Sequence, residues 1–500
     1  MPSGRLARLP FWPFAVTTAC AVVAGCTAAE DPPGRTVGTA GAAVLDRPSA
    51  TVAAAAGSPP LDDAHDPGHG HQLASIAMRT WIYVAPDDRS TKLGYLRAGA
   101  VIERGAEPVG NKRCAGGWYR VVPRGYVCVG KGASLSLDHQ VVQAALRGPD
   151  RSGGPPYRYV MSRERPPHLY FRLPSREDQE RTEGSTLGTH LAMLGGLDDV
   201  LGPFDPVPEF LAQGRDLPKP YGAEEKLHYS VHTGKARESS AFGLVAAFEW
   251  TGRHFGLTTE LDLIPLDRTK PARPSSFKGI VVETEGMPAF VVRGGAIKYR
   301  TDSLGTPRED GQAPGRSGWV LTGREVRGLA ETSDGTWLAT ESLIIPEKRE
   351  DPAGFARAGK KWIDISIKRQ TLIAYEGTRP VYATLVSTGL AGMGDPETTP
   401  STIRGTFMIH AKHVSATMDG ELAEGDFDLR DVPFIQYFTG NYALHGAYWH
   451  DEFGKARSHG CINLAPADAA WLFEWTDPVV PKEWHGAVNL EAGTLVYTHP

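Results

Sequence analysis

Glycine and proline interrupt this chain so often that only short secondary-structure elements fit between them. Of its 500 residues, 57 are glycine and 39 are proline, whereas average proteins contain about 7% and 5% of these residues. Both are unfavourable inside helices and common in turns. The segments between them alternate apolar and polar side chains, as residues 362–367 do, and this period of two is typical of strands. We therefore predict a mainly β protein with short helices, and the length predicts about three domains.

Charge and hydropathy exclude three classes of protein. The formal net charge of −5 argues against a nucleic-acid-binding protein, because such proteins are usually strongly basic. Hydrophobic residues make up 41% of the chain, which excludes a wholly disordered protein and a membrane protein with many spans. We therefore expect a folded protein with no nucleic-acid partner.

The N-terminus predicts export. Two arginines precede an apolar segment, residues 9–25, that is too short and too often interrupted by proline to span a membrane. This pattern predicts a signal peptide over residues 1–25. The residues Val-Ala-Gly before Cys26 resemble the lipobox of bacterial lipoproteins, in which a signal peptidase cuts before the cysteine and the thiol becomes lipidated. The resemblance implies a periplasmic protein with a lipid on Cys26, anchored in the outer membrane because threonine and not aspartate follows the cysteine. The alternative is an ordinary signal peptide cut at the same position, with Cys26 incidental.

Residues 26–72 have the composition of a tether. They contain no aromatic side chain and are rich in Ala, Gly, Pro and Asp. Such a segment cannot bury enough apolar surface to fold, so we predict that it is disordered. Three histidines near its end lie beside aspartates, but no rigid element would hold them in a metal-binding geometry. We therefore expect no metal site in this segment.

Residues 73–135 contain short strands separated by turn sequences. This segment resembles the bacterial SH3-like barrel, a small module that often accompanies secreted cell-wall enzymes. Cys114 and Cys128 flank a Gly-Trp-Tyr strand, and in an exported protein we expect them to form a disulfide. The alternative is two buried thiols. Three aromatic residues form either the core of the barrel or a ligand-binding surface: Trp81, Trp118 and Tyr119.

The middle of the chain contains none of the common catalytic or nucleotide-binding motifs. Residues 136–221 are charged and rich in proline, and we predict a mixed linker region. Residues 222–350 are expected to form two further small β units, for which an SH3-like fold is one option. The reason is a weak repeat, in which an aromatic residue, Thr-Glu and an aliphatic strand closed by proline occur in residues 254–265 and again in 336–346.

Residues 362–498 contain the residue types that acyl transfer needs. His445 closes one predicted strand, and Cys461 lies within another, over residues 458–464. If these strands are neighbours, the imidazole can reach the thiol and form a thiolate–imidazolium pair that attacks an amide or ester carbonyl. The glycine before Cys461 permits a tight backbone conformation, so the N–H groups of Gly460 and Cys461 could hold the negative charge of the intermediate. Asn463 adds a side-chain amide nearby.

The motif around these residues is similar to the signature of the L,D-transpeptidases with a YkuD-type catalytic domain. It consists of His445-Gly446 and, after a short loop, Ser458-His459-Gly460-Cys461-Ile462-Asn463. The resemblance implies a β-sandwich-like catalytic domain over residues 362–498, in which Cys461 is the nucleophile and His445 the general base. It also implies that the Gly446 carbonyl orients the imidazole, and that the other motif residues shape the nucleophile turn and the oxyanion site: Ser458, His459, Gly460 and Asn463.

Some roles in this region stay open. His459 lies two residues from Cys461, so on a strand the two side chains would share a face, and His459 competes for the role of base. Ser458 is expected to satisfy local backbone groups rather than to take part in catalysis. Residues 413–431, rich in Asp and Glu, are expected either to cover the substrate groove as a lid or to form a solvated loop.

The resemblance implies a peptidoglycan L,D-transpeptidase. In this reaction the cysteine forms a thioester with the third residue of a tetrapeptide stem, releases D-Ala, and passes the acyl group to an amine of another stem, which gives a 3–3 cross-link. No metal or cofactor is expected, the partners are peptidoglycan stem peptides and the membrane, and the protein is expected to be a monomer. The same thioester would serve an L,D-carboxypeptidase, or an enzyme that forms or cleaves links between proteins and the wall. A third alternative is a lipid-anchored scaffold that binds the cell wall through its SH3-like modules.

Overall fold

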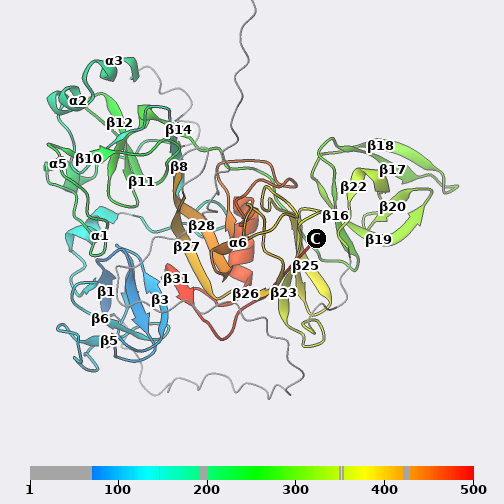
Figure 1. Ribbon diagram of the computed structural model, residues 1–500, viewed down its shortest axis with the longest axis horizontal. Coiled ribbons are helices and arrows are strands. Elements are labelled where there is room, and N and C mark those ends of the chain that lie inside the picture. Colours follow the sequence, from blue (N-terminus) through cyan, green and yellow to red (C-terminus); the bar gives the residue numbers. More distant parts are fainter. Residues whose placement is uncertain are drawn as a thin grey trace, which may run out of the picture.

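The computed structural model describes residues 70–145, 147–190, 197, 201–347, 351, 354–420 and 427–500. Within these ranges strands predominate and the helices are short (Figure 1), which confirms the mainly β prediction. No helix among the described residues is both long and apolar enough to cross a membrane. Cys26, the predicted signal peptide and most of the predicted tether lie outside the described residues.

The C-terminal region packs two sheets on one helix (Figure 1). One sheet has the order β15-β25-β24-β23-β32-β26. In the other, β28 pairs with β27 and β29, β27 pairs with β31, and β29 pairs with β30. Apolar side chains of the helix α6 (Pro466–Trp475) enter a core shared by both sheets, as expected for a sandwich-like domain. The strands are β15 (Ile280–Val281), β23 (Lys361–Ser366), β24 (Thr371–Glu376), β25 (Arg379–Leu385), β26 (Gly405–Met408), β27 (Ala411–Gly420), β28 (Phe427–Thr439), β29 (Tyr442–Gly446), β30 (Ile462–Leu464), β31 (Gly486–Val488) and β32 (Leu495–His499).

Buried polar contacts fix both ends of α6. The helix begins at Pro466, where the missing N–H costs no helical hydrogen bond. In its first turn the Asp468 carboxylate accepts the Tyr382 hydroxyl at 2.7 Å and the Gly279 N–H at 2.8 Å. At its other end the Nζ of Lys412 donates to the carbonyls of Phe473 and Thr476, at 2.5 and 2.7 Å. These contacts connect α6 to both sheets.

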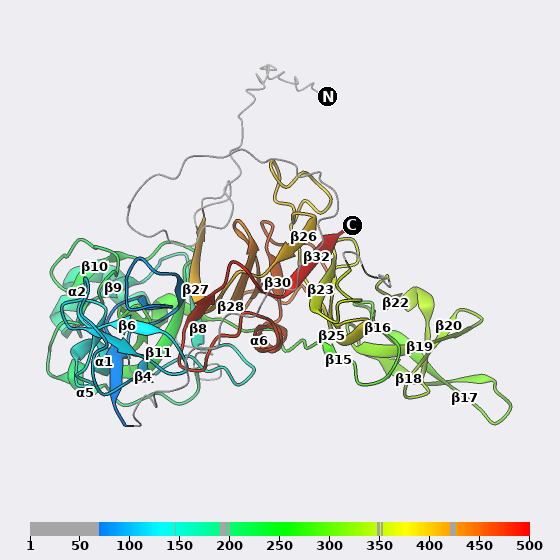
Figure 2. The same cartoon turned by 90° about the horizontal axis from the view of Figure 1, so that it is seen from below.

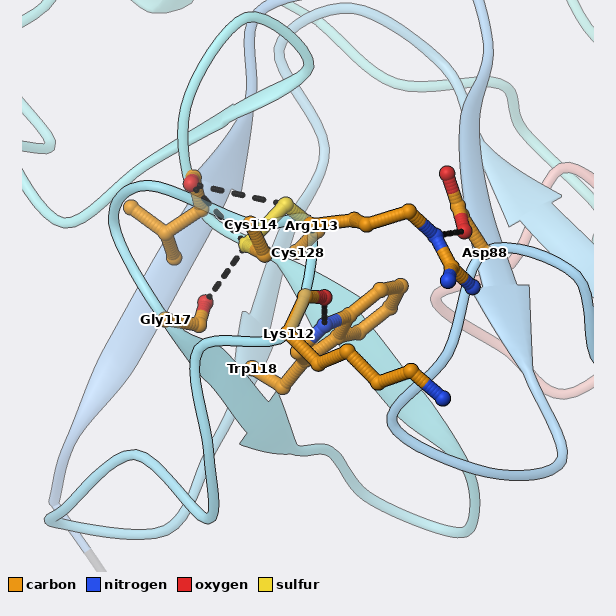
Figure 3. The surroundings of a disulfide bond; sticks show 8 residues. Asp88, Lys112, Arg113, Cys114, Gly117, Trp118 and Cys128 are labelled. Atoms are coloured by element: carbon orange, nitrogen blue, oxygen red, sulfur yellow. Dashed lines mark hydrogen bonds and ion pairs between the residues drawn. A yellow bond between two sulfur atoms is a disulfide. The ribbon is translucent and has the colours of Figure 1, made fainter.

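The N-terminal module, residues 72–134, folds into two small sheets with the orders β4-β1-β7 and β3-β2-β6-β5. The predicted disulfide joins Cys114 to Cys128 (Figure 3). Beside it Trp118 is fully buried and donates its indole N–H to the Lys112 carbonyl at 2.8 Å, so Trp118 belongs to the core. The elements are β1 (Gln72–Ser75), β2 (Thr80–Tyr83), β3 (Lys92–Leu96), β4 (Val101–Glu103), β5 (Trp118–Arg120), β6 (Tyr126–Cys128) and β7 (Ala133–Ser134), followed by α1 (Gln140–Ala145).

The expected linker over residues 136–221 is instead part of a second folded unit. β8 pairs with β11 and β14, while β9 pairs with β10 and β13. One charge of this segment is paired in the interior, because the buried carboxylate of Glu183 binds Arg253 at 2.6 Å, and Arg253 also binds the buried Asp267 at 2.7 Å. The elements are β8 (Arg158–Ser162), β9 (His168–Tyr170), α2 (Arg176–Glu183), η1 (Gly184–Thr186), α3 (Leu187–His190), α5 (Glu209–Ala212), β10 (His232–Lys235), β11 (Ala241–Trp250), β12 (Arg253–Thr258), β13 (Leu263–Pro265), η3 (Leu266–Arg268) and β14 (Thr269–Pro271).

The expected two β units of residues 222–350 divide differently. Strands β10–β14 belong to the second unit, and only β16–β22 form a sheet of their own, in the order β18-β17-β21-β20-β19-β16-β22. The structural repeat is a strand, a 3-10 turn and a strand in residues 263–271 and 337–344, and it is therefore shifted from the sequence repeat. The third unit consists of β16 (Met287–Val291), β17 (Ala296–Thr301), β18 (Pro307–Ala313), β19 (Gly318–Val326), β20 (Leu329–Thr332), β21 (Trp337–Ala339), η4 (Thr340–Ser342) and β22 (Leu343–Ile344).

The N-terminal module and the second unit both extend the C-terminal sheet that contains β27, β28 and β31. β3 pairs antiparallel with β31, through Gly94 and Tyr95, and Ala241 of β11 pairs in parallel with Leu429 of β28. The third unit extends from the opposite side of the C-terminal region (Figures 1 and 2). The C-terminal region therefore lies between its neighbours and contacts all of them.

Candidate active site

Two neighbouring strands bring the predicted catalytic residues together. β29 and β30 pair in parallel, with Leu444 opposite Ile462 and His445 opposite Asn463. Cys461 directly precedes β30 and packs in one apolar cluster with Ala443, which lies two residues before His445 on β29. His445 and Cys461 are 2% and 3% exposed. The condition behind the sequence prediction, that these strands are neighbours, is confirmed.

The surroundings of His445 determine its protonation. Its Nδ1 lies 3.2 Å from the carbonyl oxygen of Gly446. A carbonyl can only accept, so Nδ1 carries the proton and Nε2 keeps its lone pair. Burial lowers the pKa of His445 to about 4, although the contact with the Gly446 carbonyl acts in the opposite direction. The imidazole is therefore neutral at pH 7 and its Nε2 is available as a base.

The thiol of Cys461 lies in an apolar pocket of the second sheet. It packs with Met418, Ile435 and Ala443, among other side chains. The Sγ also donates to the Asn441 carbonyl, 3.5 Å away, just before β29 begins. Cys461 is not part of a disulfide. The Cys461 thiol is therefore in its reduced form and lies among apolar side chains.

The turn before the cysteine is held by its own hydrogen bonds. Gly460 has a φ of +133°, and a Cβ there would come within 2.8 Å of the Tyr442 ring, so only glycine fits. Its N–H donates to Ser458 Oγ at 3.1 Å, while the Ser458 hydroxyl donates to the Cys461 carbonyl. Ser458 thus satisfies the local backbone, as predicted. The Gly460 N–H is already bonded within the turn, which differs from the oxyanion role expected for it.

His459 does not share the environment of the cysteine. Residues 459–461 form a bend and not a strand, so the alternation that would align His459 with Cys461 does not apply. The His459 side chain is exposed, whereas His445 is buried. The structure therefore favours His445 as the base. A residue that sequence reasoning missed, Thr402, completes the turn by donating to the Gly460 carbonyl at 2.8 Å.

Comparison with known families decides the type of this domain. The family model of the YkuD L,D-transpeptidase catalytic domain matches residues 360–497. These residues form an L,D-transpeptidase catalytic domain. The predicted range was 362–498, so the family suggested by the motif around Cys461 is confirmed for this part of the chain.

Individual relatives resemble the transpeptidase domain at low identity. The Bacillus subtilis protein YciB, named after the L,D-transpeptidases, is 26% identical over 129 residues, which are 23% of this chain and 59% of YciB. The chain thus spans about three fifths of the length of this curated relative. The catalytic domain of the Enterococcus faecium L,D-transpeptidase is 22% identical, covering 28% of this chain and 98% of that chain with a TM-score of 0.22. L,D-transpeptidase 3 of Mycobacterium tuberculosis, in complex with a faropenem-derived adduct, is 20% identical, covering 28% and 60% with a TM-score of 0.22.

A second histidine lies in the site of the transpeptidase domain. His450, in the loop between β29 and β30, is 7% exposed, and its Nε2 lies 3.0 Å from the amide nitrogen of Asn463. Its ring also packs near Phe453, with 5.0 Å between ring centroids. Sequence reasoning missed His450, because its contact with Asn463 is known only from the fold.

The acidic segment of residues 413–431 is not a free loop where the structure describes it. β27 and β28 pair antiparallel on both sides of residues 421–426, which lie outside the described residues. Met418 is buried, and Asp428 bonds to Arg430 at 3.0 Å. The acidic side chain of Asp428 is therefore paired with a basic one.

The described residues offer no evident metal site. Within the part of the chain that the structure covers, no group of three or more His, Cys, Asp and Glu side chains could hold a metal ion.

Proposed function

We propose that this protein is a peptidoglycan L,D-transpeptidase that forms 3–3 cross-links. The observation that carries the proposal is the parallel pairing of β29, which holds His445, with β30, which Cys461 directly precedes. Both residues lie in the part of the chain that the family model of the L,D-transpeptidase catalytic domain matches. The substrate class follows from the type of domain, whose family acts on peptidoglycan stem peptides. The acyl acceptor is the part of the proposal that most needs a test.

The two half-reactions follow from the protonation of His445. As the Cys461 sulfur attacks the carbonyl of the third stem residue, Nε2 of His445 takes the thiol proton. The imidazolium then returns this proton to the departing D-Ala amine as the C–N bond breaks, which leaves a thioester. An amine of a second stem attacks the thioester and loses a proton to His445. The C–S bond breaks, the sulfur regains the proton, and the cross-link is an ordinary amide.

Muropeptide analysis tests the reaction and its acceptor together. Sacculi are incubated with the purified protein or with the Cys461→Ala variant and analysed by mass spectrometry. New 3–3 dimers made only by the unchanged protein are the expected result. Tripeptides without dimers would move the assignment to an L,D-carboxypeptidase, and no change with either protein would leave the scaffold alternative.

We also propose that the protein is exported and held in the periplasm by a lipid on Cys26, with an SH3-like N-terminal module. Support comes from the signal-like N-terminus and the lipobox-like sequence, and from the small sheets and disulfide of residues 72–134. Labelling of cells with a radioactive fatty acid should mark the protein and should not mark the Cys26→Ala variant. Equal labelling of both would contradict the lipid anchor.

A further inference from the structure

The ring of His450 makes two contacts that determine its tautomer. Its Nδ1 accepts the backbone N–H of Glu452 at 3.2 Å, and its Nε2 faces the side-chain amide of Asn463 at 3.0 Å. A backbone N–H can only donate, so Nδ1 holds a lone pair. Burial lowers the pKa of His450 to about 4, so the ring is neutral at pH 7 and carries one proton. That proton is on Nε2.

The tautomer in turn determines the orientation of the Asn463 amide. Two N–H donors cannot bond to each other, so the atom facing Nε2 is the amide oxygen, since the two ends of an amide are distinguished only by such contacts. The NH2 group then occupies the other position, a buried site at which no donor reaches the amide. A buried N–H donor is unfavourable unless an acceptor reaches it. An oxygen of the substrate would be such an acceptor.

The strand register places this donor beside the catalytic base. Asn463 stands directly opposite His445 in the parallel pair, and paired residues of neighbouring strands share a face. We propose that His450 is a positioning residue, which turns the Asn463 NH2 group toward the catalytic face, where it donates to the oxygen of the scissile carbonyl. This rests on the proposed acyl transfer by Cys461. It supplies a donor for an oxyanion site in which the Gly460 N–H is already bonded to Ser458.

The loop that carries His450 is held by the third unit. Arg316 donates two hydrogen bonds to the Asp451 carboxylate, at 2.7 and 2.9 Å, and Arg293 donates to the Asp451 carbonyl at 2.9 Å. Bidentate pairs of this kind define direction as well as distance. Phe277, which lies between β14 and β15, stacks on Phe453, three residues after His450 in the same loop. β16–β22 therefore do more than extend from the domain (Figure 2), because they hold the residue next to His450.

The tautomer can be read directly and without activity. Nitrogen–proton correlation spectra of the purified protein, labelled with 15N-histidine, distinguish protonated from unprotonated ring nitrogens, and the His450→Gln variant assigns the signal. We expect an Nε2–H ring at pH 7. An Nδ1–H ring would overturn the proposal, whether or not the protein makes cross-links.

Kinetics test the positioning role. His450→Phe keeps an aromatic ring at this position but offers no hydrogen-bond donor. We expect kcat to fall at least about tenfold with little change in KM, because an oxyanion donor acts mainly in the transition state. His450→Gln can accept from Glu452 and donate to Asn463, and should restore most of the loss. Wild-type kcat in His450→Phe, or equal loss in both variants, would overturn the proposal. Failure of the proposed function differs, because then the unchanged protein is inactive too.

The contribution of the third unit has a matched control. Arg316→Met removes the bidentate contact to Asp451, the residue next to His450. We expect kcat to fall by about 2–10-fold, because the loop then holds His450 less firmly. Arg300→Met removes an ion pair to Asp310 on the same unit, between partners that are both about half exposed, and should leave kcat unchanged. Equal kcat in the two variants would show that the loop does not depend on this contact.

Discussion

At the scale of residues, the chemistry depends on burial more than on motif spacing. His445 and His459 belong to the same motif, but only His445 is buried and has its Nδ1 held by a carbonyl. Burial keeps the pKa of His445 near 4, so the ring is a base over the whole neutral range. The His459 side chain is exposed instead.

One substitution at each position distinguishes the roles of His445 and His459. His445→Gln removes the base, and we expect a loss of about a hundredfold or more in kcat/KM. His459→Gln should cost much less, because its side chain is exposed. Release of D-Ala from a tetrapeptide measures both. A larger loss in His459→Gln would return the role of base to His459.

At the scale of elements, one buried carboxylate connects three units. Asp431, on β28, bonds to Arg97 of the N-terminal module, to Thr259 of the second unit and to Ser415 of β27. Its carbonyl accepts the Tyr159 hydroxyl at 2.6 Å. Arg97 and these hydroxyls keep the pKa of Asp431 below its usual value in spite of its burial, the largest effect, which raises it. β28 also pairs with the strand of His445, so this cluster supports the active-site sheet.

Removal of Arg97 should therefore weaken more than the N-terminal module. Arg97→Met leaves a buried carboxylate without its cation, which costs about 3–5 kcal/mol. We expect the urea midpoint of unfolding of Arg97→Met to lie below that of the unchanged protein. The midpoint should be lower both when unfolding is followed by tryptophan fluorescence and when it is followed by the loss of D-Ala release. Arg300→Met removes an exposed pair and should change the free energy of unfolding by less than about 1 kcal/mol. A shift confined to one probe would mean that the module unfolds separately.

At the scale of the whole molecule, buried neutral histidines should limit stability in acid. Burial lowers the pKa of several histidines from 6.5 to between about 3 and 4, and these lie in the second unit as well as in the transpeptidase domain: His168, His413, His445, His450 and His485. Below pH 6.5 the unfolded chain binds protons that the folded chain does not. Acid therefore favours the unfolded state.

The free energy of unfolding should fall as the pH drops from 6.5 toward 4. Each such histidine contributes a slope of up to about 1.4 kcal/mol per pH unit in this window. Urea titrations at pH 7.5, 6 and 5, followed by circular dichroism, measure the decrease. His445→Gln removes one of these groups and should show a shallower decrease. A free energy of unfolding that rises between pH 7.5 and 5 would contradict the explanation.

Local patterns predicted much of this protein. Alternation in residues 362–367 predicted β23, the resemblance of the motif around Cys461 indicated its family, and two cysteines in a chain expected to be exported predicted the disulfide of Cys114 and Cys128. Each of these depends on neighbours in the sequence or on compartment. The linker over residues 136–221 was predicted wrongly, because sequence shows that Glu183 and Arg253 are charged but not that they meet in the core.

The sequence alone determined the residue types of the site: a cysteine, a histidine sixteen residues before it, and a glycine that permits the turn between them. Only the tertiary structure decided which histidine of the motif is buried, what the Gly460 N–H bonds to, and that His450 faces Asn463. The physical reason is that these outcomes depend on strand register and on burial. Both arise when segments far apart in the chain pack together, and neither leaves a local pattern.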